Sequence, residues 1–504
     1  MTVRDNPATR SRWSGDTALL IYIALATMAV HLAAGGRYGF HRDELALLDD
    51  ARHLAWGYVA YPPLTPFFAR LALVLFGTSL DGFRFFAALA QAVGVLATGL
   101  MARELGGSRE AQLLATMAAL PACIAEGTLM QYVSFDYLFW VLTAYFILRL
   151  VKSRDTRWWI AIGVSIGLGM MSKYTMLVFV CGVAAGVVLT DARGLLKSRW
   201  LLAGIAASFV IFLPNLLWQI QNHFVSLDFL QHIHARDVRI GRTKDFLPDQ
   251  LRSTALGAPL WTAGLVLCAV SERAKRWRAL AWMYIVPLVL FVIAKGRGYY
   301  MAPAYPMLYG AGSVWLTGAL ARVRRPWASV WRGAAWTALA ANVVLTSVFF
   351  VPIAPVGSRM WRFAAHLNGD LREEIGWQEL VQTVAQVRDS LPASERAHLA
   401  VLTANYGEAG AINLYGPAYG LPPAISGINS FWARGYGSPP PDSVIVLGLS
   451  PSFVEQRFTP CRVAAKIWNP FGVRNEEAER PDILVCGPPR AGWETFWKDS
   501  RYYG

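Results

Sequence analysis

Long apolar segments alternate with short polar ones over residues 1–351 of the chain. A helix that crosses a bilayer needs about 20 mostly apolar residues, because each residue adds only about 1.5 Å of length. The pattern therefore predicts an all-α polytopic membrane domain with about eleven transmembrane helices. We expect them at residues 17–34, 82–101, 111–127, 136–150, 157–171, 174–190, 200–218, 258–271, 279–294, 301–320 and 333–351.

The distribution of basic residues predicts how these helices are oriented. If the N-terminus lies in the cytoplasm, every strongly basic short loop also falls on the cytoplasmic side, as the positive-inside rule requires. The first apolar run has no small-residue cleavage site, so we interpret it as a signal anchor that stays in the protein. The cations in question are Arg4, Arg10 and Arg12 before the first helix, then Arg103, Arg109, Arg149, Lys152, Arg154, Arg157, Arg193, Lys197, Arg199, Arg273, Lys275, Arg276, Arg278, Arg322, Arg324, Arg325 and Arg332.

Three longer segments are predicted to lie outside the cytoplasm. In the first, residues 35–80, an apolar stretch at 67–77 is too short to span and is expected to lie along the membrane interface. The second is residues 219–257. The third, residues 352–504, is expected to form a small extracytoplasmic α/β domain. It should contain an amphipathic helix at 373–390 and strands at 398–403, 443–448 and 482–486.

The composition also indicates a membrane protein. Hydrophobic residues make up 55% of the chain and charged residues only 16%, whereas a soluble domain carries roughly 25% charged residues. The net charge of +14 could favour nucleic acid as a partner. Because the cations concentrate in the predicted cytoplasmic loops, we expect no nucleic-acid partner.

Two carboxylates stand next to each other in the sequence FHRDEL, just after the first predicted helix: Asp43 and Glu44. A carboxylate at a membrane surface, with an arginine beside it, is suited to act as a general base. Acidic residues are equally favoured at an ordinary helix start by the helix dipole. A further acid, Asp136, stands at the outer mouth of a predicted span, where it can be functional, a helix N-cap, or both at once.

Several cations stand on the side of the membrane that the positive-inside rule predicts to be poor in basic residues. Lys173 and Tyr174 fall in a predicted outer turn, and another outer turn contains Lys295, Arg297 and Tyr300. A lysine near a helix end often only extends its ammonium to the membrane surface. Cations and tyrosines on one face are also suited to binding a phosphate at the level of the lipid headgroups, and such a phosphate site is our hypothesis.

The five cysteines are too few for a disulfide scaffold and lack the spacing of a zinc site. Cys461 and Cys486 are the two in the predicted outer domain, where disulfides can persist. Cys461 precedes the apolar stretch 462–468 and Cys486 ends the expected strand 483–485, and a polar turn around residues 475–480 separates the two stretches. Neighbouring strands could therefore bring the two sulfurs within bonding reach, although two unpaired thiols are the alternative.

Six segments resemble bacterial members of glycosyltransferase family 39, which includes the dolichyl-phosphate-mannose protein mannosyltransferases and the lipid A aminoarabinose transferases. They are spread over most of the chain in the expected order. The segments are YGFHRDELALLDDARHLAWGYVAYPPLTPFFAR (38–70), SFDYLFW (134–140), GLGMMSKYT (167–175), PNLLWQIQNHF (214–224), KGRGYYMAPAYP (295–306) and ANYGEAGAINLYG (404–416).

The resemblance implies a C-type glycosyltransferase, which takes a sugar from a polyprenyl-phosphate lipid on the outer face and transfers it with inversion. The family's first-loop acid matches Asp43, with Glu44 beside it, and its second acid matches Asp136. The basic residues can stabilise a leaving phosphate without a divalent metal, so none is expected to be required, although a metal stays possible. The resemblance does not identify the class of acceptor, which is an envelope lipid, a glycan or a protein.

A different class of function is a lipid-linked sugar transporter or flippase without transferase activity. A transporter would be expected to have charged or broken segments near the middle of its spans, whereas the ionisable residues here cluster at the outer ends. A membrane anchor for the outer domain is a third class. It would leave Asp43, Asp136 and Lys173 without a reason for sharing one face. The sequence therefore favours the transferase.

Overall fold

The structure is a computed structural model that describes residues 7–504, so Arg4 lies outside the described residues. The chain forms two compact units. The first consists of Met1–Ala34, Arg84–Gln221 and His234–Val351. The second consists of Gly35–Phe83, Asn222–Ile233 and Pro352–Gly504. The second unit thus contains the predicted outer domain together with the whole first outer segment and a short piece of the next one.

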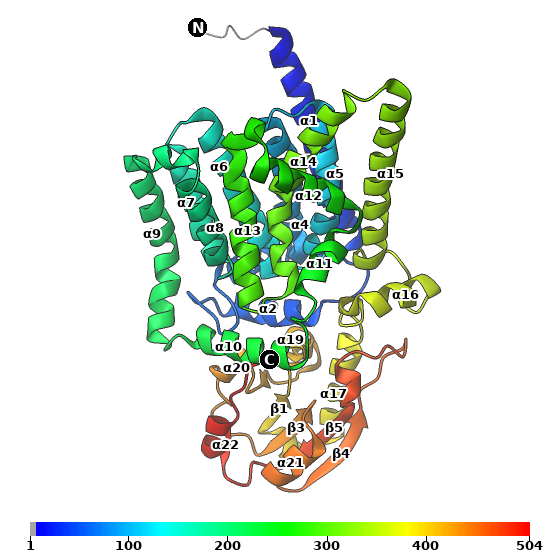
Figure 1. Ribbon diagram of the computed structural model, residues 1–504. Helices are drawn as coiled ribbons and strands as arrows, with labels where there is room; N and C mark the ends of the chain where they lie inside the picture. The colour runs from blue at the N-terminus through cyan, green and yellow to red at the C-terminus, as the bar shows by residue number, and fades with distance from the viewer. Residues whose placement is uncertain (1–6) are drawn as a thin grey trace. The chain divides into compact units, whose positions relative to one another are not determined.

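All eleven predicted apolar segments of the first unit form helices (Figure 1). Many of them begin or end within a few residues of the predicted boundaries, because the apolar runs end where polar or basic residues begin. The helices are α1 (Pro7–Ala34), α4 (Leu80–Glu104), α5 (Arg109–Gly127), α6 (Tyr132–Ser153), α7 (Trp158–Met170), α8 (Met176–Val188), α9 (Arg199–Gln221), α12 (Ala258–Val270), α13 (Arg278–Ile293), α14 (Tyr305–Leu320) and α15 (Arg325–Phe350).

Within the described residues, seven helical segments are long and apolar enough to cross a membrane. The helices α7 and α8 have 13 residues each, which gives a length of about 20 Å and is shorter than a typical hydrocarbon core. Close packing accompanies this shortness. A Cβ atom on Gly163 of α7 would lie 1.9 Å from the carbonyl oxygen of Gly204 on α9, so only glycine allows these two backbones to approach each other.

The basic loops of the first unit meet at one end of the bundle. Glu104, the last residue of α4, pairs with Arg149 at 3.3 Å and with Lys152 at 3.0 Å near the end of α6. Arg276, which follows α12, donates a hydrogen bond of 3.0 Å to the carbonyl oxygen of Val151. These loops are grouped as the charge pattern predicts. That this end faces the cytoplasm stays a prediction from the positive-inside rule.

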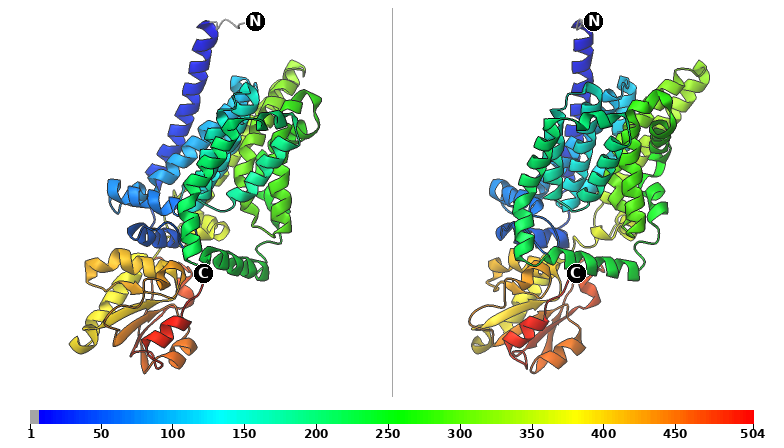
Figure 2. Two further views of the ribbon diagram at one scale, coloured as in Figure 1. Left: turned by 90° about the vertical axis from the view of Figure 1, so that its left-hand side faces the viewer. Right: turned by 60° about the vertical axis from the view of Figure 1, so that its left-hand side comes forward.

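The second unit is built on a sheet of five strands in the order β2-β1-β3-β5-β4. The strand β1 pairs in parallel with β2 and β3, whereas β5 is antiparallel to both of its neighbours. Figure 2 shows α17 and α22 on opposite sides of this sheet. The strands are β1 (Leu399–Thr403), β2 (Ala424–Ile425), β3 (Ser443–Leu447), β4 (Cys461–Lys466) and β5 (Asp482–Cys486).

The predicted α/β character of this unit is confirmed. The strands β1, β3 and β5 coincide with the predicted ones, but the helix predicted from residue 373 begins only at Trp377, because Gly376 adopts a left-handed φ of 99°. The apolar stretch at 67–77 forms most of the short helix α3 (Leu64–Phe76).

The remaining helices belong to both units. They are α2 (Arg42–Arg52), α10 (Val225–Arg239), α11 (Phe246–Thr254), α16 (Arg359–Leu367), α17 (Trp377–Ser390), α18 (Ala393–Arg396), α19 (Tyr406–Tyr415), α20 (Asn429–Trp432), α21 (Pro451–Arg457) and α22 (Trp493–Asp499).

Candidate functional site

The ammonium group of Lys173 lies among three tyrosine rings in the first unit. Lys173 stands in the turn between α7 and α8, and its Nζ is 5.3 Å, 5.0 Å and 4.4 Å from the ring centres of Tyr132, Tyr299 and Tyr300. The Ser172 hydroxyl fixes the turn by donating to the carbonyl oxygen of Tyr132 at 3.0 Å. Three ring faces stabilise a cation there without neutralising its charge.

Asp136 stands next to this ammonium. Its Oδ2 accepts a hydrogen bond of 2.8 Å from the Thr175 hydroxyl and lies 3.9 Å from Lys173 Nζ. At 3.9 Å the ammonium is held near the carboxylate but is too far for a hydrogen bond. Asp136 is buried, with 3% of its surface exposed. It is the fifth residue of α6, whose N-cap is Gln131, so Asp136 does not cap the helix, and its side chain is directed to the lysine turn.

Tyr174 points to a different helix from Lys173. Its hydroxyl donates a hydrogen bond of 3.0 Å to the side-chain oxygen of Asn215, and it accepts one of 2.9 Å from Gln219. Both partners are buried and lie one turn apart on α9. Tyr174 thus ties the lysine turn to α9. The sequence PNLLWQIQNHF contains these two amide residues, but nothing in its pattern indicates their partner.

The two predicted cations of the other outer turn, Arg297 and Lys295, lie in different environments. Arg297 donates to Oδ2 of the buried Asp237 at 2.5 Å and to the Tyr299 hydroxyl at 3.5 Å. It is therefore linked to the tyrosines around Lys173. Lys295 is exposed, and it forms no ion pair within the part of the chain that the structure describes. Sequence reasoning missed Asp237, because a lone acid in a polar segment carries no distinguishing signal.

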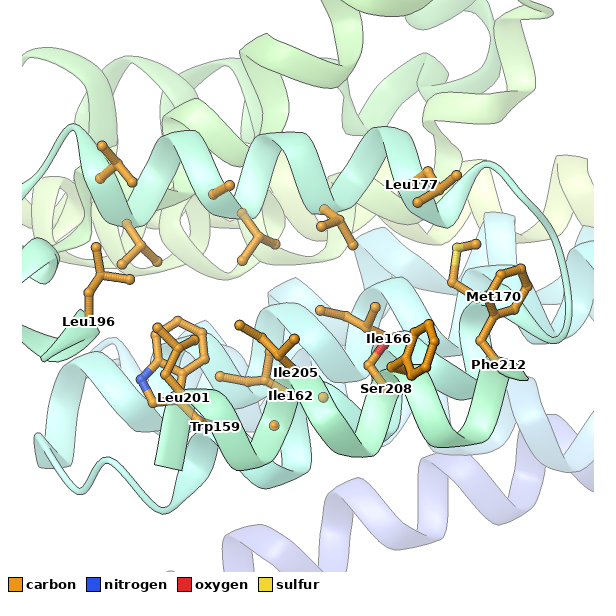
Figure 3. Close-up of a pocket in the computed structure, with 18 of the residues that line it drawn as sticks. Trp159, Ile162, Ile166, Met170, Leu177, Leu196, Leu201, Ile205, Ser208 and Phe212 are labelled. Atoms are coloured by element: carbon orange, nitrogen blue, oxygen red, sulfur yellow. The ribbon is translucent and has the colours of Figure 1, made fainter. Parts of the chain in front are cut away.

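An apolar groove with a volume of about 580 Å³ lies between α7, α8 and α9. Trp159, Leu196 and Leu201 line one end of it, and Met170, Leu177 and Phe212 line the other (Figure 3). Met170 ends α7 and Leu177 belongs to the first turn of α8. The turn that contains Lys173 therefore stands at the second end of the groove, where Tyr174 also forms part of the lining.

Asp43 belongs to the second unit and is accessible. It stands in the first turn of α2, its side chain is 41% exposed, and its Oδ1 accepts a hydrogen bond of 2.8 Å from the Tyr406 hydroxyl. Arg42 Nε lies 3.9 Å from the same oxygen, and His41 Nδ1 lies 3.8 Å from Oδ2. A carboxylate with this surrounding can accept a proton from a bound hydroxyl.

Glu44 has a different place from its neighbour. Its side chain is buried and accepts a hydrogen bond of 2.9 Å from the backbone N–H of His41, while the His41 ring accepts the backbone N–H of Asp43 at 3.2 Å. This is a capping box that begins α2. Helix capping by itself is therefore enough to explain why a glutamate stands at position 44.

Two buried acids that the sequence did not indicate, Glu408 and Glu477, lie beside Asn405. Glu477 is 2% exposed and accepts a hydrogen bond of 3.2 Å from the Asn405 side chain. Burial, with the charges of Glu373 and Glu408 nearby, raises the pKa of Glu477 to about 8. Burial also raises the pKa of Glu408 to about 7, although the backbone N–H groups of Asn405 and Ala404 oppose the rise.

Cys461 and Cys486 are joined by a disulfide, with an S–S distance of 2.06 Å. The two residues stand directly opposite each other on the antiparallel strands β4 and β5. No group of three or more His, Cys, Asp or Glu side chains in the described chain is arranged to hold a metal ion.

Residues 60–218 match the family described as dolichyl-phosphate-mannose-protein mannosyltransferase. This confirms the family resemblance that the motifs indicated. The fold is similar to that of ArnT from Cupriavidus metallidurans. With its structure bound to undecaprenyl phosphate the TM-score is 0.60 at 15% identity, covering 94% of this chain and 98% of that one. With its apo structure the TM-score is 0.59 at 16% identity, with the same coverage. No curated protein matches the chain by sequence.

Proposed function

We propose that this protein is an integral-membrane, inverting glycosyltransferase. It moves a sugar from a polyprenyl-phosphate-linked donor to an acceptor of the bacterial cell envelope, on the extracytoplasmic face of the inner membrane. The acceptor hydroxyl belongs to a lipid, a glycan or a protein. The family match over residues 60–218 and the shared fold with a protein crystallised with undecaprenyl phosphate support this assignment.

The observation that carries the proposal is that Lys173 stands in the turn at one end of the apolar groove. A polyprenyl phosphate is a long apolar chain with an anionic head. The groove offers apolar side chains along its length, and the turn at one of its ends contains Lys173 next to the lining residue Tyr174. Lys173 Nζ is 3.9 Å from its nearest carboxylate, so it can still form short hydrogen bonds to a phosphate. The groove between α7, α8 and α9 then holds the first part of the lipid chain.

The chemistry needs a base and a stabilised leaving group. As the acceptor oxygen attacks the anomeric carbon, its proton passes to Asp43, and the bond between that carbon and the phosphate oxygen breaks. The polyprenyl phosphate leaves with the bonding electrons, and its added charge is stabilised by Lys173 and by Arg297, which Asp237 holds in place. Because the acceptor oxygen attacks from the side opposite the phosphate, the configuration at the anomeric carbon is inverted.

In this scheme Asp136 orients Lys173. Its carboxylate is fixed by Thr175 and attracts the ammonium without binding it directly. The ammonium thereby keeps donors for the phosphate, and the tyrosine rings limit where it can move. No step requires a divalent metal, and a chelator should leave the rate unchanged.

The function can be tested with purified protein in lipid vesicles. A panel of polyprenyl-phosphate sugars is supplied with an extract of envelope lipids and glycans, and both the released polyprenyl phosphate and the modified acceptor are measured by mass spectrometry. We expect one donor to be consumed, and Lys173→Ala to reduce its consumption. The same envelope fractions from cells with and without the gene should differ by one sugar. Unchanged donors in the first experiment and unchanged fractions in the second would contradict the proposal.

A further inference from the structure

The helix α19 of the C-terminal part of the chain packs along α2, the helix that begins with Arg42 and Asp43. We infer that Tyr406, the first residue of α19, is a positioning residue for Asp43, so that the C-terminal part of the chain orients the proton acceptor. This inference rests on the proposed function, in which Asp43 accepts the proton of the acceptor hydroxyl.

The contact between the two helices is continuous along α2. Tyr406 donates to Asp43 Oδ1 at 2.8 Å at one end. Toward the other end, the Asn413 side chain donates to Asp49 Oδ1 at 2.6 Å, and Arg52 donates to the Asn413 carbonyl oxygen at 2.9 Å. Hydrogen bonds at both ends fix the register of α19 on α2, and with it the position of the Tyr406 hydroxyl.

Two glycines allow this close approach. A Cβ atom on Gly410 would lie 2.4 Å from the backbone carbon and oxygen of Leu45, so no other residue fits there without moving α2. A Cβ atom on Gly407 would lie 2.7 Å from the Cβ of Arg42. The segment ANYGEAGAINLYG thus places small residues where α2 crosses and a tyrosine where the carboxylate stands.

The start of α19 is itself held firmly. Asn405 caps the helix by accepting the backbone N–H of Glu408 at 2.8 Å, and the Glu408 carboxylate accepts the backbone N–H of Asn405 at 3.1 Å. This capping box follows directly on the buried strand β1. Tyr406 therefore extends from a rigid part of the domain, so its hydroxyl can hold a carboxylate in one orientation.

The hydrogen bond from Tyr406 restricts rotation of the Asp43 carboxylate. With Oδ1 held at 2.8 Å by the Tyr406 hydroxyl, the carboxylate keeps one orientation relative to α2. The Arg42 guanidinium carbon lies 5.7 Å from the centre of the Tyr406 ring and adds a second contact that restricts the ring. Orientation of a general base contributes to turnover because proton transfer requires short, aligned hydrogen bonds.

The test is a double-mutant cycle on the full-length protein with the donor consumed by the wild type. Tyr406→Phe removes only the hydroxyl and should lower kcat about 10-fold or more, the scale of one hydrogen bond to a charged group, while KM for the donor stays within about 2-fold. In the Asp43→Asn background the same substitution should change kcat by less than about 2-fold, because the hydroxyl acts through the carboxylate.

Tyr419→Phe is the matched control. Tyr419 belongs to the same domain, is 39% exposed and should tolerate the loss of its hydroxyl with unchanged kcat. An equal loss from Tyr406→Phe in both backgrounds would mean a merely structural role and would overturn the inference, as would an unchanged kcat in the single variant. A wild-type protein that consumes no donor would instead overturn the proposed function, and this inference with it.

Discussion

Lys173 Nζ lies 4.4 Å from the centre of the Tyr300 ring, although the two residues are more than a hundred positions apart in the chain. Lys173 stands in the turn between α7 and α8, and Tyr300 belongs to the short 3₁₀ helix Gly298–Ala304. Both were expected near a donor phosphate because of their charge, their aromatic character and their predicted side of the membrane. Lys295 of the same predicted outer turn as Tyr300 is exposed, so substitutions at Lys173 and Lys295 can test which cation contacts the donor.

Replacing Lys173 by Ala should weaken donor use about 10- to 100-fold, because a lost charged contact with a phosphate costs about 1.5–3 kcal/mol. Arg297→Ala should act in the same direction. Lys295→Ala is the matched control and should change donor use less than about 2-fold. Titration of the donor at saturating acceptor measures these effects. Equal effects at Lys173 and Lys295 would mean that Lys173 has no special contact with the donor.

Asp43→Asn should lower turnover by at least about 100-fold, the contribution expected from a general base, while the fold is kept because the two side chains are nearly the same size. Glu44→Gln should have a smaller effect, because glutamine can replace glutamate in a capping box. Single-turnover rates, together with size-exclusion profiles that report folding, distinguish the two. Near-normal turnover in a folded Asp43→Asn protein would remove this residue from the mechanism.

A larger side chain in the groove should lower the rate of transfer from donors with a long lipid chain more than from donors with a short one. Ile205 lines the groove from α9, so Ile205→Trp should reduce the use of a long polyprenyl donor more than that of a donor shortened to one or two isoprene units. Leu202 lies on the same helix, is 68% exposed and does not line the groove, so Leu202→Trp serves as the control. The ratio of the two donor rates is the measurement. An unchanged ratio in Ile205→Trp would place the lipid chain elsewhere.

The buried Glu477 should make stability depend on pH. Burial raises its pKa to about 8 in the folded protein from the ordinary 4.5, so the unfolded chain releases the proton first as pH rises. The contribution to stability is full below about 4.5 and is lost as pH rises through about 8. Thermal unfolding of the wild type between these values should therefore show a fall that Glu477→Gln reduces. Parallel curves for the two proteins would exclude this residue as the cause.

The disulfide should contribute to stability and little to transfer. It closes a loop of 25 residues, which corresponds to a stabilisation of about 3 kcal/mol on the chain-entropy model. Alkylation of denatured protein from its native membrane, before and after reduction, should label Cys461 and Cys486 only after reduction. Labelling of both without reductant would refute the bridge and weaken the placement of this domain outside the cytoplasm.

The sequence by itself determined the membrane helices. Each apolar run from residue 17 to 351 forms a helix, because the cost of exposing backbone polar groups in a bilayer leaves long apolar segments little alternative. It also indicated Asp136, Lys173 and Tyr300 as candidates, since charges and tyrosines at helix ends on the less basic side are unusual enough to be noticed. The strands β1, β3 and β5 could be predicted because each is a short buried apolar run.

Only the tertiary structure decided which of these side chains meet. Thr175, Asn215 and Asp237 are ordinary polar residues in the sequence, and their contacts with Asp136, Tyr174 and Arg297 depend on how separate helices pack. The same holds for Tyr406 and Asp43, which are 363 positions apart and meet because Gly407 and Gly410 let α19 approach α2. Hydrophobic periodicity specifies which face of a helix is buried, but the partner of a polar side chain is set by close packing between elements distant in the chain.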